Sequence, residues 1–128
     1  MTRIKSKVMK LVIAGMILLG GCIGANTAVK DFIPGTYVCP IHQEYSIGSD
    51  TLVISLLHDN SYAILKNSGF RRIVNGRLLP AQHSSKHWAG LYDGNTRQLV
   101  EQLQGRVFSF DVAGNALYSG GNEYKKLP

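Results

Sequence analysis

The sequence predicts an all-β fold, a small antiparallel meander of about eight to ten strands closed as a barrel or folded as a sandwich. Three observations predict it. Short β-branched and aromatic runs alternate with polar residues at a period of two, and Gly- and Asn-rich turn signals recur about every 8–12 residues. Beyond residue 21, no segment shows a convincing amphipathic helical pattern. A closed barrel also removes the free strand edges that recruit other chains.

Residues 1–21 have the parts of an export signal and are expected to form a signal helix. A basic start is followed by the apolar run 11–19 and by the small pair Gly20-Gly21. A run of about nine apolar residues is too short to cross a bilayer, which takes roughly 20 residues, but it matches the apolar region of a secretory signal. The basic residues are Arg3, Lys5, Lys7 and Lys10.

The motif Leu19-Gly20-Gly21-Cys22 resembles the lipobox of bacterial lipoproteins. The resemblance implies cleavage before Cys22, acylation of its thiol and of the new amino group, and membrane anchoring through these chains. An ordinary signal peptide ending near a cysteine and an uncleaved anchor are the alternatives. Ile23 after the cysteine implies, by the enteric sorting rule, an outer-membrane location facing the periplasm. The expected organisation is signal peptide 1–21, lipidated tether 22–31 and one β domain, 32–128.

Charge argues against a nucleic-acid partner. The whole chain has a formal net charge of +6, but four of its 14 basic residues lie in the expected signal. The mature part keeps ten basic residues against eight acidic ones, a net charge of +2. A nucleic-acid-binding domain is expected to be strongly cationic, and this one is not.

The first half of the domain predicts two hairpins. Strands are expected over 50–57 and 61–66, joined by a turn at 58–60, and a further turn is expected at Asn67-Ser68-Gly69. Asn75-Gly76 is a strong hairpin signal because both central residues of that turn take positive φ. The residues expected on inner faces are Leu52, Ile54, Leu56, Tyr62 and Ile64.

The second half repeats this pattern. Residues 97–103 fit either a strand or a short helix, and the flanking Gly94-Asn95 and Gly105 favour the strand. In the run 106–111, Phe108 and Phe110 share one face, opposite Val107. The other expected strands are 87–93, 116–119 and 123–127, with turns at 94–95, 114–115 and 120–122.

The layout of residues 34–127 resembles small lipocalin-like barrel domains of bacterial envelope lipoproteins, including the NlpE type. The resemblance rests on the start Pro34-Gly-Thr-Tyr-Val, the succession of hairpins and the end Asn122-Glu-Tyr-Lys-Lys-Leu. This chain lacks the paired cysteines that NlpE-type domains carry near their start. The resemblance therefore implies a fold and no function.

No catalytic or cofactor motif is present, so the chain is expected not to be an enzyme and to need no cofactor. His83 and His87 would bind a metal only on a helix face, and 80–87 is expected to be a loop, so no metal site is predicted. Asp93 and Glu101 are expected on the surface. Cys39 is expected to be a small buried hydrophobe, with intermolecular pairing as the alternative.

Aromatic residues are expected to fill the barrel, and a filled core is favoured over a cavity. If a small apolar ligand binds, the candidate ligand-binding residues are Trp88, Tyr92, Phe108 and Phe110. Tyr118 and Tyr124 complete the expected aromatic core. Candidates for a modest basic face are Arg71, Arg72, Arg77 and Arg106, although Arg71 and Arg72 point to opposite faces of a regular strand.

The sequence thus predicts a non-catalytic, membrane-anchored envelope lipoprotein that binds another envelope protein. A lipocalin-like binder of a small apolar ligand is one alternative. The other is a periplasmic inhibitor of a lysozyme-like enzyme, because Thr36-Tyr-Val-Cys39 resembles the start of small lipoprotein inhibitors. For an inhibitor, Pro80 to Lys86 is the candidate protruding loop.

Overall fold

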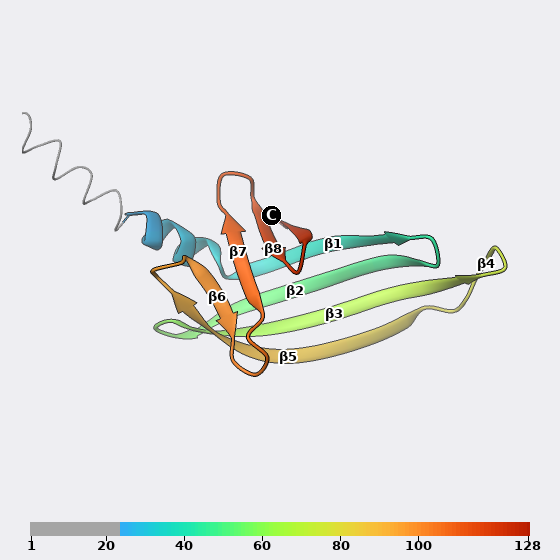
Figure 1. The fold of residues 1–128 in the computed structure, drawn as a ribbon, viewed down its shortest axis with the longest axis horizontal. Helices are drawn as coiled ribbons and strands as arrows, with labels where there is room; N and C mark the ends of the chain where they lie inside the picture. Colours follow the sequence, from blue (N-terminus) through green and yellow to red (C-terminus); the bar gives the residue numbers. More distant parts are fainter. Residues whose placement is uncertain (1–23) are drawn as a thin grey trace, which may run out of the picture.

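A computed structural model describes residues 24–128, which form an antiparallel β-barrel of eight strands, one additional short strand and a helix at 24–32 (Figure 1). The order around the barrel is β2-β1-β9-β8-β7-β6-β5-β3, and pairing of β2 with β3 closes it. The all-β barrel predicted from the sequence is confirmed. The strands are β1 (Gly35–Gln43), β2 (Ser46–His58), β3 (Ser61–Val74), β4 (Arg77–Leu78), β5 (Gln82–Asp93), β6 (Gln98–Glu101), β7 (Val107–Asp111), β8 (Ala116–Ser119) and β9 (Asn122–Lys126).

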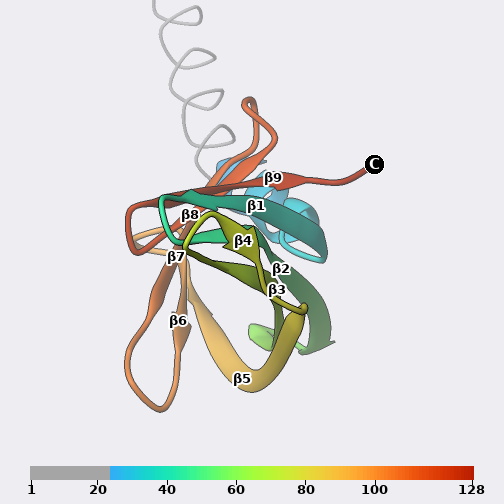
Figure 2. The same cartoon turned by 90° about the vertical axis from the view of Figure 1, so that its right-hand side faces the viewer.

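The strands differ greatly in length, and this gives the molecule an arm. β2, β3 and β5 have 13, 14 and 12 residues, whereas β6 to β9 have four or five. β9 pairs with β1 only at Tyr37 and Val38, so the barrel closes around one end of the long strands. Beyond it, residues 39–50, 67–74 and 82–87 continue with β4 as a curved ribbon, here called the arm (Figures 1 and 2).

Two expected breaks in this ribbon are absent. Asn67-Ser68-Gly69 lies inside β3, paired with β2 on one side and β5 on the other, so the predicted turn is wrong. Pairing on both edges outweighs the local turn preference, and the Ser85 hydroxyl donates a hydrogen bond to Oδ1 of Asn67. The expected loop 80–87 is likewise strand from Gln82 onward, which removes the candidate loop of an inhibitor.

The expected core is largely confirmed. Leu52, Ile54, Tyr62 and Ile64 are buried, but Leu56 is exposed near the end of β2, just before an irregularity in the β2–β3 pairing between Leu56 and His58. Tyr118 is also exposed, contrary to expectation, since its neighbour Leu117 takes the inward position on β8. The other buried core residues of the barrel strands are Tyr37, Tyr92, Leu99, Phe108, Ala116, Leu117 and Tyr124.

Local predictions hold at two further places. Asn75 and Gly76 have φ of 51° and 74° and connect β3 to β4, as the hairpin signal predicts. Of the ambiguous segment 97–103, residues Gln98–Glu101 form β6, which confirms the strand.

The N-terminal helix, 24–32, covers one end of the barrel and takes up most of the segment that was expected to be a tether, 22–31. Val29, Phe32 and Ile33 are buried against the core. The Tyr37 hydroxyl shares its single proton between the carbonyl oxygens of Phe32 and Ile33, each 2.8 Å away, at a helix end where carbonyl groups are otherwise unpaired. Val29, Phe32 and Ile33 span the expected boundary between tether and domain at residue 31.

Side chains from the barrel hold this helix further. The Lys126 ammonium donates to the Phe32 carbonyl and lies 4.2 Å from the centre of the Phe32 ring, a cation at a helix C-terminus. The Tyr92 hydroxyl donates to Oδ1 of Asn26 at 2.9 Å. The motif Leu19-Gly20-Gly21-Cys22, which resembles a lipobox, lies outside the described residues. Within residues 24–128, no helix is long and apolar enough to span a membrane.

Candidate functional site

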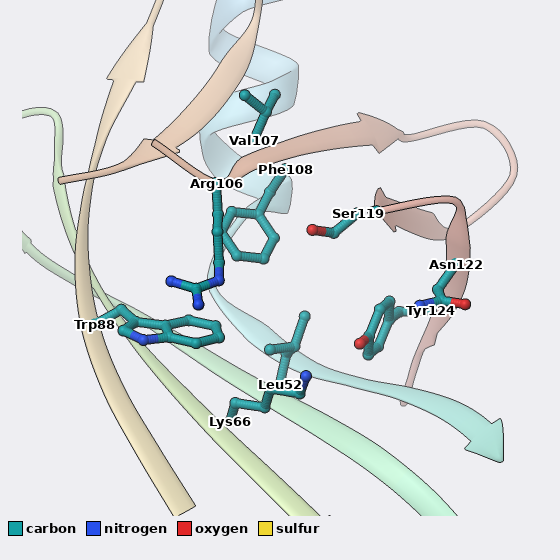
Figure 3. Close-up of a pocket in the computed structure, with 10 residues that line it drawn as sticks. Leu52, Lys66, Trp88, Arg106, Val107, Phe108, Ser119, Asn122 and Tyr124 are labelled. Atoms are coloured by element: carbon teal, nitrogen blue, oxygen red, sulfur yellow. The ribbon is translucent and has the colours of Figure 1, made fainter. Parts of the chain in front are cut away.

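A hollow of about 370 Å³ opens at the barrel end opposite the helix, where the arm begins (Figure 3). Its floor is apolar, its rim carries two cations, and the turn between β8 and β9 forms the far wall. A volume of this size is within the range of small-molecule sites. The lining residues are Leu52, Lys66, Trp88, Arg106, Val107, Phe108, Ser119, Gly120, Asn122 and Tyr124.

Only two of the four predicted ligand-binding residues line this hollow. Trp88 and Phe108 do, with ring centroids 6.4 Å apart. Phe110 instead packs edge-on against Phe32 at 6.2 Å, and Tyr92 bonds to the helix. Residues two apart on a strand share a face but are about 7 Å apart along it, so Phe110 reaches the helix-covered end while Phe108 reaches the open one.

Arg106, predicted from the sequence only as part of a modest basic face, lies at the hollow. Its guanidinium carbon lies 4.3 Å from the centre of the Trp88 ring, a cation–π contact. Its Nη1 donates to Oε2 of Glu101 at 3.2 Å. Glu101 and Arg106 flank the turn that ends in Gly105, and this spacing could have predicted an ion pair between them. Nothing in the sequence predicted that either residue lies near Trp88.

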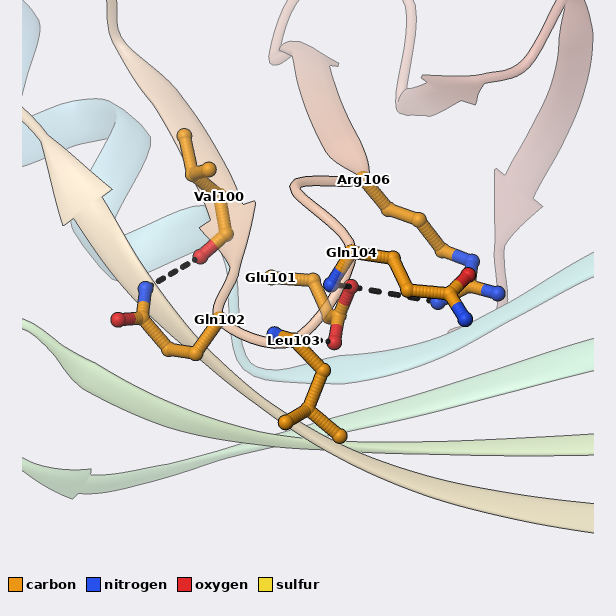
Figure 4. A network of polar contacts seen from close by, with 6 residues as sticks. All are labelled: Val100, Glu101, Gln102, Leu103, Gln104 and Arg106. Atoms are coloured by element: carbon orange, nitrogen blue, oxygen red, sulfur yellow. Dashed lines mark hydrogen bonds and ion pairs between the residues drawn. The ribbon is translucent and has the colours of Figure 1, made fainter.

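Glu101 is buried, at 1% relative exposure, so its expected place on the surface is wrong. Its carboxylate accepts hydrogen bonds from the backbone N–H of Leu103 at 2.8 Å and of Gln104 at 3.1 Å, besides that from Arg106 (Figure 4). Burial raises the pKa of Glu101, but these hydrogen bonds together outweigh it and hold the pKa below the usual value of a glutamate. The carboxylate thereby fixes Arg106 against Trp88.

This network predicts a pH dependence of stability. A carboxyl whose folded-state pKa is depressed stabilises the fold above its unfolded pKa, about 4.3, and that stability is lost as pH falls through the folded-state value. Glu101→Gln is therefore expected to lower Tm at pH 7 by about 5–10 °C and to flatten the fall of Tm between pH 5 and 3. Thermal melts followed by circular dichroism measure both.

Glu123→Gln is the matched control, because Glu123 is exposed and its partner Lys125, at 2.7 Å, is exposed as well. This variant should melt like the wild type at pH 7. Equal pH slopes for the wild type and Glu101→Gln would contradict the role given to the buried carboxylate.

Lys66 is the second cation of the hollow. Its ammonium lies 3.8 Å from Oδ2 of Asp50, a long and partly exposed ion pair of a kind that contributes little. Lys86 lies directly opposite Lys66 in the β3–β5 ladder, and like charges so placed repel. Across the hollow, burial raises the pKa of Tyr124 to about 12, so its phenol is neutral at physiological pH.

The remaining candidate groups form no reactive cluster. Cys39 is half-buried on β1, and burial followed by the nearby Asp50 raises the pKa of its thiol, which disfavours the nucleophilic thiolate. His83 and His87 lie on β5, which is a strand and offers no helix face. Within residues 24–128, no three His, Cys, Asp or Glu side chains are grouped so that they could hold a metal ion.

The far end of the arm, here called the arm tip, is defined by Tyr45, Arg71, Arg72, Val74, Arg77 and Leu78. Arg71 and Arg72 are neighbours on β3 and project from opposite faces of the ribbon, so the arm tip is the whole end of the arm rather than one face. All six are exposed, Tyr45 by 71%. The segments that make up this end of the arm, 43–49 and 69–81, contain three arginines and one acid, Glu44. The rest of the chain from residue 22 has seven basic and seven acidic residues, so the net charge of +2 resides at this end.

Comparisons with protein-family models, with curated proteins and with solved structures found no match to this chain.

Proposed function

We propose that this chain is a non-catalytic lipoprotein of the bacterial envelope, anchored through Cys22, whose arm tip binds another envelope protein with an acidic surface. The observation that carries the proposal is the arm tip itself. It joins exposed Tyr, Val and Leu side chains to three arginines, against one acidic residue, Glu44, in the same segments. Tyrosine and arginine are the residue types most enriched at protein interfaces, and a positive patch favours an acidic partner.

The placement of anchor and arm supports the same function. One residue, Ile23, separates Cys22 from the helical segment that covers the barrel end. The linker between a lipid on Cys22 and the barrel is therefore short. The arm points away from that end (Figure 1). β3 has 14 residues, and its 13 steps of about 3.3 Å give a length of roughly 43 Å. An anchored barrel would therefore present its arm tip well away from the bilayer, facing the periplasm if the outer-membrane location holds.

A photo-crosslinking residue at position 45 tests this proposal in intact cells that make the full-length protein. We expect a discrete protein adduct from position 45 and none from position 118, an exposed tyrosine on the barrel wall. The double variant Arg72→Glu, Arg77→Glu is expected to lower the adduct yield at least tenfold, because the charge complementarity is reversed.

The double variant Lys30→Glu, Lys125→Glu is the matched control. It changes the net charge by the same amount at positions outside the arm and should leave the adduct intact. An adduct that persists in the Arg72, Arg77 variant, or that forms equally from position 118, would contradict binding through the arm tip.

A further inference from the structure

The hollow at the barrel mouth has features that partner binding through the arm tip does not use. We propose that it binds a small organic anion, with a flat apolar group against Trp88 and Phe108 and a carboxylate or phosphate held by Lys66 and Arg106. This ligand class differs from the purely apolar one expected from the aromatic residues alone. The proposal is independent of the arm tip, since the arm-tip residues and the lining residues do not overlap.

The apolar part of the site consists of side chains that belong to the core or pack against it. Trp88, Phe108, Leu52 and Tyr124 come from four different strands and form its floor. Leu52, Phe108 and Tyr124 are buried among the core residues. The guanidinium of Arg106 stacks on the Trp88 ring in a cation–π contact. A planar group entering the hollow would therefore meet a preformed apolar surface, which lowers the ordering cost of binding.

Lys66 and Arg106 each have an acidic partner, but neither partner uses all of the donors of its cation, so both cations can also bind an anion. Within residues 24–128, the guanidinium of Arg106 donates a hydrogen bond through Nη1, to Glu101. A guanidinium has five N–H donors, so others remain for a ligand, and in Figure 3 the group ends in the hollow. Lys66 also ends there, and its pair with Asp50 is long, at 3.8 Å.

The lysine pair adds a second argument. Lys66 and Lys86 face each other directly across β3 and β5, and nothing in strand pairing requires two like charges at this position. A bound anion would relieve that repulsion. The wall opposite offers neutral donors, the Ser119 hydroxyl and the Asn122 amide, which suit a carboxylate or phosphate without adding charge.

Trp88 is the only tryptophan of the chain, so its fluorescence reports on this site alone. We would titrate the full-length protein in non-ionic detergent with 4-nitrophenyl phosphate, 4-nitrobenzoate and the neutral 4-nitrobenzyl alcohol, whose common ring quenches tryptophan. We expect saturable quenching by one or both anions, with an affinity at least tenfold above that for the alcohol. Lys66→Met, which keeps the apolar stem, should weaken anion binding about tenfold and leave the alcohol unchanged.

Lys30→Met, on the helix at the other end of the barrel, is the control and should bind like the wild type. Equal quenching by anions and alcohol, or an anion affinity unchanged in Lys66→Met, would overturn the proposal. An anionic group is also carried by lipid head groups, but the hollow opens at the end away from the helix and its neighbouring anchor site. We therefore expect phosphatidylglycerol vesicles not to compete with the anionic probe, and competition would overturn a free small molecule as the ligand.

Discussion

Replacing Cys22 by serine is expected to move the protein from the membrane fraction to the soluble fraction almost completely. Each buried acyl CH₂ contributes on the order of 0.8 kcal/mol, and stable anchoring takes two or more chains. Within residues 24–128, no helix is long and apolar enough to replace that contribution. Fractionation of cells after a high-salt wash, followed by immunoblotting, measures the change. Mass spectrometry of the wild-type N-terminus should show an acylated Cys22.

Cys39→Ser is the matched control, because Cys39 is the only other cysteine and lies half-buried on β1. It should stay with the membranes like the wild type. A Cys22→Ser protein that remains membrane-bound after washing would contradict lipidation as the anchor. Because this result concerns the anchor alone, it is separable from the crosslinking result at the arm tip.

The fold could be predicted from the sequence because its signals are local. Alternation at Leu52, Ile54, Tyr62 and Ile64 and the turn at Asn75-Gly76 depend on a few neighbouring residues, and the structure confirms them. The length of the strands could not be predicted in this way. Asn67-Ser68-Gly69 is a turn signal by itself, and only pairing with strands distant in sequence keeps it extended.

The candidate site, too, depends on contacts between residues that are distant in the sequence. Residue type alone singles out four aromatic candidates, and two of them, Trp88 and Phe108, lie at the hollow. Phe108 and Phe110 differ in their position along the barrel axis. The helix covers the end that Phe110 reaches, through Phe32, and leaves the end at Phe108 open. The burial of Glu101 depends on two backbone N–H groups presented by the turn that follows it. Neither the placement of the two phenylalanines nor the burial of Glu101 can be predicted from local sequence patterns.

The arm itself depends on one glycine. A Cβ at Gly48 would collide with the carbonyl oxygen of Gly69 and would lie 2.6 Å from Cα of Phe70, and both are backbone atoms that cannot move without separating β2 from β3. We therefore expect Gly48→Ala to destabilise the protein by about 3 kcal/mol or more. Urea unfolding followed by Trp88 fluorescence gives the free energy, and hydrogen exchange shows whether arm amides lose protection before those of the barrel.

Gly69→Ala is the matched control on the facing strand. Its Cβ would meet only the imidazole of His83, at 3.2 Å, an exposed side chain free to rotate away. This variant should be neutral or slightly stabilised, since alanine reduces the entropy of the unfolded chain. If β2–β3 pairing positions the arm tip, Gly48→Ala should also abolish the crosslink from position 45 while every arginine of the tip is kept. A Gly48→Ala protein with wild-type stability would show that the two strands do not approach so closely, and the arm would then lose its structural basis.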